Sequence, residues 1–383
     1  MYKSFAAILF FTMCVGCKMQ SGPNNAAPTA PPSIIKSERA LDLVGNGKFG
    51  GDGWIAGHVG KDKAYYVRTL SPENIPTDIK SSLGNTTLID INNKGVVIGR
   101  IEVPDSAPTI VGEGFLYTPA GGLQRLLEVL PKQNQDASEI YTLRDVNPIA
   151  INNAGVITGT VRLNINDEKL DPPPRYVFTW KIDDFHINLI KGMVDDVRPS
   201  ADAQTLKLPV DRVAAINEAG ELALGCGDTT TPCVFNSERK LVNIYDTNMP
   251  EIPTNSWFAQ MNNTGLFGVE FYKQIDDVPG VAVALWSFKE GLVPLPMPEG
   301  YVLCDISAID ENQVAAGVCV PSRGFGGIPI VWKNGEALNL NVGLTAKDNY
   351  YWDIHDIDQD GRFLVSGNKR STGNFSLYIV TLK

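Results

Sequence analysis

One short segment recurs six times in this chain of 383 residues, and it constrains the fold more than any other feature. Each copy has an apolar residue, an Asn or Asp, a short turn, and a run in which small and apolar residues alternate. The copies are DINNKGVVIGR at Asp90, AINNAGVITGT at Ala150, AINEAGELALG at Ala215, QMNNTGLFGVE at Gln260, AIDENQVAAGV at Ala308 and DIDQDGRFLVSG at Asp356. A weaker, earlier copy ends in GWIAGHV at residues 53–59, which makes seven.

A second element follows each copy as an apolar run that often ends in an aromatic residue. The runs are AYYV, GFLY, YVFTW, CVF, VALW, PIVW and SLYIV. Short segments rich in Val, Ile and aromatic residues, separated by Gly, Asn and Pro, are typical of strands. A further short apolar segment, such as KLVNIY or EALNLN, precedes the next copy, and successive copies lie 45 to 65 residues apart. Four strands per unit at this spacing predict an all-β fold, a β-propeller with seven four-stranded blades; six or eight blades are the alternatives.

The recurring Asn-x-x-Gly is interpreted as the hairpin turn between the first two strands of each blade. Asn and Asp side chains bond to the local backbone, and Gly adopts the left-handed conformation that such turns need. The last unit ends after its third strand at FSLYIVTLK, so a strand near IIKSERALDLV, residues 34–44, is expected to complete that blade.

The pattern resembles the extracellular repeats called HAF repeats over nearly all of the chain after residue 40. The Asn-x-x-Gly turns, the GxVxG-like strands and the strands ending at Trp180, Trp286 and Trp332 carry the resemblance, although the His-Ala-Phe triplet is missing. The resemblance implies an exported, propeller-like protein. It implies no catalytic residues.

The N-terminus has the design of an export signal. Lys3 precedes an apolar run that ends at Val15-Gly16-Cys17, which favours a lipoprotein signal over residues 1–16 and lipidation of Cys17. Cys14 stands where Leu is usual, and an ordinary secretory signal is the alternative. Residues 17–38 form a Pro-rich tether, and residues 39–383 form one propeller domain. Lys18, rather than Asp, after the cysteine favours an outer membrane if the cell has two.

The net charge of −10 and the absence of basic clusters exclude sequence-independent binding of nucleic acid. The four cysteines of the body lie in local pairs, and in an exported chain an even number indicates disulfides. We expect the bonds Cys226–Cys233 and Cys304–Cys319. A zinc site is the alternative, but no CxxC spacing supports it.

Two motifs suggest ligands. GNGKFG, residues 45–50, matches GxGxxG, but the glycines and strand that follow favour a loop over the helix a dinucleotide site needs. DIDQDG has alternating carboxylates at Asp356, Asp358 and Asp360, which could hold a structural calcium ion. Gly367 stands where the bidentate glutamate should be, so a plain hairpin turn is the other interpretation. No other cofactor is expected.

The sequence holds no HExxH, GxSxG or phosphate loop, and His355 is interpreted as structural. Long, variable connections at 131–148, 162–175, 191–209 and 271–280 should emerge together on one face. They predict an acidic, loop-built surface, with Asp167, Asp171, Asp195, Asp196, Asp276 and Asp277 as candidate binding residues. The predicted function is a non-enzymatic, lipid-anchored module that binds a protein or glycan at the cell envelope. The alternative is a polysaccharide hydrolase or lyase with carboxylates near the propeller axis.

Overall fold

The fold is seen in a computed structural model that describes the chain from residue 34 onward, with gaps. The described residues are 34–41, 46–51, 54–59, 63–68, 77–82, 84–102, 113–133, 138–166, 174–190, 193–196, 206–226, 231–236, 238, 240–244, 253, 255–275, 278–321, 326–342, 344, 349–369 and 372–383. The export signal, Cys17 and most of the tether lie outside these residues. No helix among the described residues is long and apolar enough to cross a membrane.

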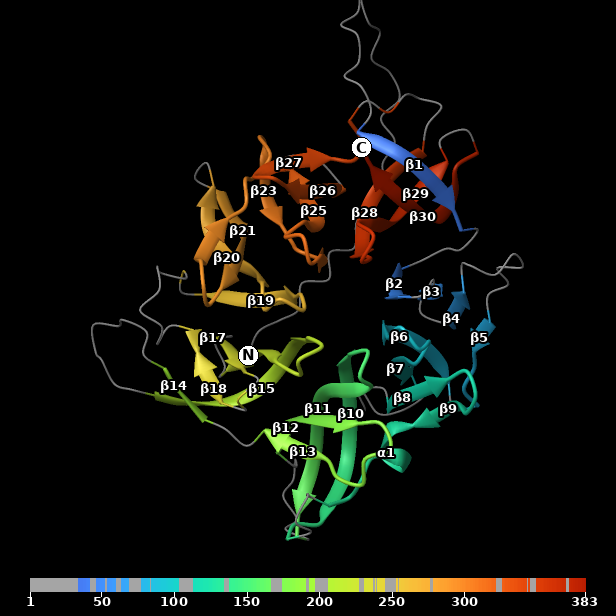
Figure 1. The fold of residues 1–383 in the computed structure, drawn as a ribbon, viewed down its shortest axis with the longest axis vertical. Helices are drawn as coiled ribbons and strands as arrows, with labels where there is room; N and C mark the ends of the chain where they lie inside the picture. Colours follow the sequence, from blue (N-terminus) through green and yellow to red (C-terminus); the bar gives the residue numbers. More distant parts are fainter. Residues whose placement is uncertain are drawn as a thin grey trace, which may run out of the picture.

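Antiparallel sheets of consecutive strands stand around a ring, which confirms the prediction of an all-β propeller (Figure 1). The first half of the chain forms three groups of four strands. These are β2 (Asn46–Gly51), β3 (Trp54–Val59), β4 (Lys63–Arg68) and β5 (Thr77–Ile79); β6 (Asn85–Ile91), β7 (Val97–Glu102), β8 (Glu113–Thr118) and β9 (Gly122–Arg125); and β10 (Tyr141–Ile151), β11 (Val156–Ile165), β12 (Arg175–Lys181) and β13 (Asn188–Ile190).

The second half continues the same pattern. A five-stranded sheet contains β14 (Met193–Asp196), β15 (Leu206–Ile216), β16 (Leu222–Cys226), β17 (Thr231–Phe235) and β18 (Leu241–Asn243). The next strands are β19 (Ser256–Met261), β20 (Phe267–Ile275), β21 (Val278–Ser287) and β22 (Gly291–Pro294), then β23 (Tyr301–Cys304), β24 (Ala308–Ile309), β25 (Ala315–Pro321), β26 (Ile328–Lys333) and β27 (Glu336–Asn339). These two groups join through a single parallel pairing of Val281 with Leu303.

The last blade is closed by the first strand of the chain. β28 (Asn349–Ile357), β29 (Arg362–Lys369) and β30 (Asn374–Leu382) are consecutive, and β1 (Ile35–Ala40) pairs antiparallel with β30. The predicted closing strand is therefore present. It begins at Ile35, four residues before the expected domain start at residue 39, because its pairing partner extends to Leu382.

The hairpin turns lie where the repeat predicts them. Asn92 accepts hydrogen bonds through Oδ1 from the N–H groups of Lys94 and Val96, and Gly95 has φ +74°. The turn after β10 has the same contact between Asn152 Oδ1 and the Val156 N–H. The six turns follow β6, β10, β15, β19, β24 and β28, and each of these strands pairs with the next strand across the turn. The turns lie on one side of the ring, here named the turn face. The connections from second to third strand emerge on the opposite side, the loop face.

The turns also bond to one another from blade to blade, which the sequence does not reveal. Asn92 donates through Nδ2 to the carbonyl of Asn152 at 3.2 Å, and Asn152 donates in the same way to Asn217 at 3.1 Å. Asn262 donates to the carbonyl of Asp310 at 2.8 Å. The side-chain amide therefore joins neighbouring blades while its oxygen shapes the turn.

A second row of bonds runs beside the first, one residue further along each turn. The Asn93 N–H donates to Asn153 Oδ1 at 2.8 Å, and the Asn153 N–H donates to the Glu218 carboxylate at 2.9 Å. The row continues from the Glu218 N–H to Asn263 Oδ1 and from the Asn263 N–H to Glu311 Oε1. We call the two rows the turn belt.

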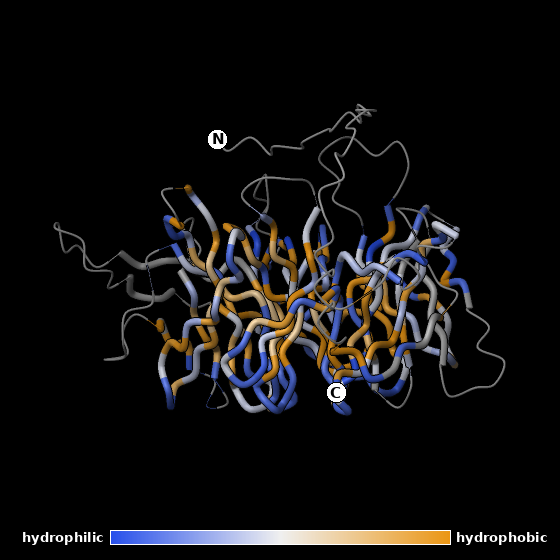
Figure 2. The backbone as a smooth tube through the Cα atoms, turned by 90° about the horizontal axis from the view of Figure 1, so that it is seen from above, coloured by the Kyte–Doolittle hydropathy of each residue, from blue (hydrophilic) through white to orange (hydrophobic). Residues whose placement is uncertain are grey.

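Apolar side chains fill the space between neighbouring sheets. One cluster combines Ile98 of β7 with Ile157 and Trp180 of the next blade. Trp180, Trp286 and Trp332 are 3%, 0% and 1% exposed, so the tryptophans of the repeat pack between blades as predicted. Figure 2 shows apolar segments through the body of the ring and hydrophilic turns along the edge where the C-terminus lies.

Two features differ from the sequence-based expectations. GNGKFG is not a loop, because Asn46–Gly51 is strand β2, the first strand of its blade. The glycines are needed for packing: a Cβ on Gly50 would lie 2.6 Å from the Asn92 carbonyl oxygen. The other feature is α1 (Leu126–Val129), one short helix that follows β9 and buries Leu126.

Both expected disulfides are present. Cys226–Cys233 joins β16 to β17 with 6.2 Å between the Cα atoms, and Cys304–Cys319 joins β23 to β25 with 4.1 Å. Each bond ties neighbouring antiparallel strands of one blade.

The turn belt predicts that the side-chain amide of the turn asparagine contributes to stability beyond its effect on the shape of the turn. Asn152→Asp keeps Oδ1 but removes the amide donor to Asn217 and places a charge beside its carbonyl, so we expect a loss of about 1–3 kcal/mol in the free energy of unfolding. Urea denaturation measures the change. The matched control is Asp310→Asn, which adds an amide to a turn that lacks one and should not destabilise. Equal stabilities for Asn152→Asp and the wild type would contradict a structural role for the belt.

Candidate binding pocket on the loop face

The predicted acidic surface lies mostly outside the described residues. Asp167, Asp171, Asp276 and Asp277 are not among them. Asp195 and Asp196 lie on β14, which pairs with β15, and the structure describes only their backbone. The acidic loop surface therefore stays a prediction.

The three candidate calcium ligands have other partners. Asp358 is buried, and its Oδ2 lies 2.6 Å from the Arg362 guanidinium, which also contacts Asp360 at 3.1 Å. Asp356 accepts hydrogen bonds from the Ile357 N–H and from the Phe49 N–H of the next blade. Among the described residues, no group of three potential metal ligands is found. The calcium site stays a prediction, and the hairpin turn is present.

Carboxylates do lie on the innermost strands, and backbone donors hold them. Asp90 on β6 accepts from the Ile91 N–H and from the Ile151 N–H of the next blade, both at 2.9 Å. Burial raises the pKa of Asp90 to about 6, although Lys48 and these two bonds lower it. The pKa of Asp356 is also raised by burial. These acids join blades, as the belt does.

His355 forms a buried polar row with its neighbours. Its Nε2 lies 2.7 Å from Ser366 Oγ, and its Nδ1 lies 3.7 Å from the Asp353 carboxylate. The residue types match a hydrolytic triad, but Ser366 is 5% and His355 8% exposed. Both side chains lie on paired strands within the last blade, where a buried hydroxyl and imidazole satisfy each other.

An open pocket lies on the loop face where the sheet of β15–β18 meets that of β19–β22. Its volume is about 350 Å³. The lining is apolar and aromatic, and it defines what we call the aromatic pocket: Val213, Ala214, Leu224, Gly225, Trp257, Phe258 and Tyr272. Trp257 is half-buried, whereas Tyr272 is 63% exposed. Their ring centroids are 5.2 Å apart with planes tilted by 59°.

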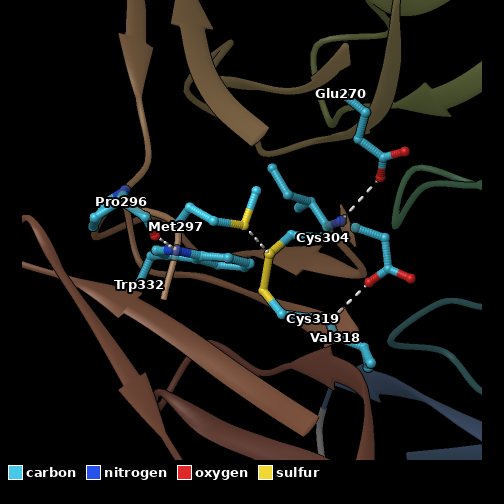
Figure 3. Close-up of a disulfide and its surroundings, with 9 residues drawn as sticks. Glu270, Pro296, Met297, Cys304, Val318, Cys319 and Trp332 are labelled. Atoms are coloured by element: carbon cyan, nitrogen blue, oxygen red, sulfur yellow. Dashed lines mark hydrogen bonds between the residues drawn. A yellow bond between two sulfur atoms is a disulfide. The ribbon is translucent and has the colours of Figure 1, made fainter. Parts of the chain in front are cut away.

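A buried glutamate fixes the position of Trp257. The indole Nε1 donates to Glu270 Oε2 at 2.8 Å, and Glu270 Oε1 accepts the Ile306 N–H of the next blade at 2.9 Å. Ile306 lies two residues after Cys304 in the chain, so the Cys304–Cys319 disulfide braces this contact (Figure 3). Burial, followed by the nearby Asp305 carboxylate, raises the pKa of Glu270, whereas its two hydrogen bonds lower it.

The opposite wall is held by the other disulfide. Gly225 and Leu224 lie on β16 directly before Cys226, which is bonded to Cys233. Both walls of the aromatic pocket are therefore attached to cross-linked or hydrogen-bonded strand ends, which favours a preformed site.

A larger, shallower groove of about 980 Å³ lies between the sheets of β6–β9 and β10–β13. Phe185, 82% exposed, and Ile140, 62% exposed, stand at its edge. Asp183 and Asp184 line it as exposed turn residues, in agreement with their interpretation as solvated charges. The aromatic pocket is the better candidate site because its walls are fixed and because it combines two adjacent, tilted rings with a buried carboxylate.

Sequence reasoning missed Trp257, Glu270 and Tyr272. Two signals could have indicated them. Trp257 lies in a first strand, outside the third-strand position that Trp180, Trp286 and Trp332 share. Glu270 is a carboxylate within the buried run GLFGVEF, which is unusual for a strand that packs on both faces.

Comparison with known proteins finds similar folds at low identity. No protein-family model matches the chain, and no curated protein matches it. Among solved structures, YCF48 bound to D1 peptide has a TM-score of 0.49 at 10% identity, over 94% of this chain and 100% of that one. The WD40 β-propeller domain of Doa1 has a TM-score of 0.42 at 11% identity, over 92% and 98%.

An acylaminoacyl peptidase of Pyrococcus horikoshii has a TM-score of 0.47 at 12% identity, over 84% of this chain and 50% of that one. At these identities and scores, the similarities carry no argument about activity. The site must be interpreted from its own residues.

The inner carboxylates predict that the protein is more stable in mild acid. Because burial raises the pKa of Asp90 from 3.8 to about 6, the folded state takes up a proton that the unfolded chain binds only near pH 4. The free energy of unfolding should therefore rise by on the order of 1 kcal/mol as the pH falls from 7 to 5. This added stability should be lost again as the pH rises through 6. Asp353, with its pKa also raised to about 6, acts in the same direction.

Thermal unfolding across this pH range measures the effect. Asp90→Asn should flatten the dependence, whereas Asp183→Asn, at an exposed turn, should leave it unchanged. A protein whose stability falls steadily between pH 7 and 5 would disprove this assignment.

The Arg362 ion pairs predict how the DIDQDG turn responds to calcium. Because the guanidinium already pairs with both Asp358 and Asp360, we expect chelator-treated and calcium-saturated protein to unfold at the same temperature in calorimetry. A rise in the unfolding temperature that scales with calcium concentration would instead support a metal site.

Proposed function

We propose that this protein is a non-enzymatic binding module of the cell envelope, anchored by lipid at Cys17, which recognises its partner on the loop face. One observation carries the proposal: a preformed, open pocket with two adjacent aromatic rings in its wall lies on that face of a rigid ring. Aromatic residues that are partly exposed in a rigid concave site are typical of recognition surfaces.

The point where the chain enters the ring supports the same orientation. Ile34 accepts a hydrogen bond from the Lys383 N–H, and Arg362, which directly follows the turn at 358–361, pairs with Thr381. A tether that leads into β1 therefore reaches the propeller at the turn face. The loop face, with the aromatic pocket, is then directed away from the membrane.

The described carboxylates support binding rather than turnover. Asp90, Asp356 and Glu270 each accept a backbone N–H from a neighbouring blade, so these acids have a structural role in joining the blades. The alternative, a polysaccharide hydrolase or lyase, needs two carboxylates free to act across a bound sugar.

The test is capture of envelope partners by the mature protein and by Trp257→Leu/Tyr272→Leu. We expect the wild type to retain a partner that the double variant loses by at least about 10-fold in affinity. The matched control is Phe288→Leu, which changes an exposed aromatic residue outside the pocket and should keep the partner.

A polysaccharide panel, scored for both binding and cleavage, distinguishes the alternative. Cleavage of any polysaccharide that persists in Trp257→Leu/Tyr272→Leu and is lost on neutralising an inner carboxylate would replace the binding module by the enzyme. Equal capture by the wild type and both variants would show that the aromatic pocket does not bind the partner.

A further inference from the structure

Glu270 is a buried carboxylate that forms no ion pair with a described cationic side chain. It is 9% exposed, and its two partners, the Ile306 N–H and the Trp257 indole, are neutral donors. No ion pair to Glu270 is found in the described parts of the chain. Buried carboxylates are usually paired with a positive group, because removing an isolated charge from water is costly.

A second carboxylate increases the negative charge behind the pocket. Asp305 accepts the Val318 N–H at 2.8 Å and makes no ion pair with any described residue. It lies close enough to Glu270 to disfavour ionisation of that group. A cation in the pocket would favour the ionised form of both acids, in a protein whose net charge is −10.

Trp257 lies between these acids and the open pocket. Its N–H is directed to Glu270, so its ring surface is left to form a wall, and the Tyr272 ring forms the adjacent wall. The faces of aromatic rings attract cations, most strongly for Trp and Tyr. A carboxylate that accepts the indole N–H makes the ring face more negative.

We propose that the aromatic pocket binds an alkylated ammonium group, the chemistry shared by choline-type head groups and methylated lysine. The proposal names a ligand class for the site of the proposed function and so rests on it. The cation would contact the faces of Trp257 and Tyr272, and its charge would compensate Glu270 through the indole.

The lining favours this ligand over other classes. A metal ion needs several oxygen or nitrogen ligands, and among the lining side chains only Tyr272 has a hydroxyl to offer. A sugar needs several polar groups to bond its hydroxyls, which these side chains do not supply. An unmodified lysine keeps a strongly hydrated ammonium, whereas alkylation removes its N–H donors and covers the charge with apolar surface.

The test compares choline with 3,3-dimethylbutan-1-ol, a neutral molecule of the same shape, by calorimetric titration of the full mature protein. We expect choline to bind at least about 10-fold more tightly than the alcohol, because only the cation interacts with the ring faces. Trp257→Leu should abolish choline binding. Phe288→Leu should leave it unchanged.

Glu270→Gln separates charge from shape. It keeps the size and one of the two acceptor oxygens, replaces the other with an NH2 group and removes the negative charge, so choline affinity should fall several-fold. Unchanged affinity for the alcohol shows that the pocket has kept its shape. A matched peptide pair, with trimethyl-lysine or with lysine, shows whether a protein side chain can also supply the group. Binding of that peptide but not of free choline would assign the ligand to a protein partner.

Equal affinities for choline and its neutral counterpart, or no binding of choline and of the trimethyl-lysine peptide, would overturn the proposal. Equal affinities of wild type and Glu270→Gln would do the same. If the alkylammonium proposal fails while capture of an envelope partner still depends on the pocket, the proposed binding function stands. The pocket would then be a site for neutral apolar groups.

Discussion

The side-chain amide of an asparagine in a hairpin turn is the interaction on which this ring depends most. Within its own blade, the Asn92 oxygen shapes the turn, and its nitrogen reaches the carbonyl of Asn152 in the next blade. Such bonds, made by Asn92, Asn152 and Asn262, satisfy carbonyl groups that would otherwise be buried without partners where the inner strands converge. The apolar contacts between blades are less directional, so these bonds, with the inner carboxylates, set how neighbouring blades align.

The aromatic pocket is a consequence of that alignment. Its walls come from two blades, and the glutamate that orients Trp257 is bonded to a third, so it forms only when three consecutive blades are correctly placed. Disulfides stand at both sides, at Cys226–Cys233 and Cys304–Cys319. A rigid frame lets a buried carboxylate persist without a cationic partner among the described residues, since local relaxation or water entry would otherwise relieve it. The alignment of the blades therefore also determines the geometry of the aromatic pocket.

Much of the fold could be predicted because its signals are local. Asn-x-x-Gly turns, alternating strands and third-strand tryptophans each act within a few residues, and closure by a strand near Ile34 followed from the missing fourth strand at the C-terminus. The belt could not be predicted, because each bond joins turns 45 to 65 residues apart. The pocket was missed for the same reason: Trp257, Glu270 and Ile306 come together across two blades. The prediction of a loop at GNGKFG was wrong because glycines that permit close packing in strand β2 resemble those of a loop.

The central claim is that the turns hold one another, and hydrogen exchange of their backbone amides tests it most directly. The N–H groups of Asn93, Asn153, Glu218 and Asn263 lie at the tips of hairpins on the molecular surface, yet each donates to a side chain of the next blade. We expect slow exchange at these four amides, much slower than at Lys289, whose N–H at another hairpin tip makes no such bond to a described residue. Exchange at the rate of ordinary exposed turns would mean that the belt does not hold the ring in solution.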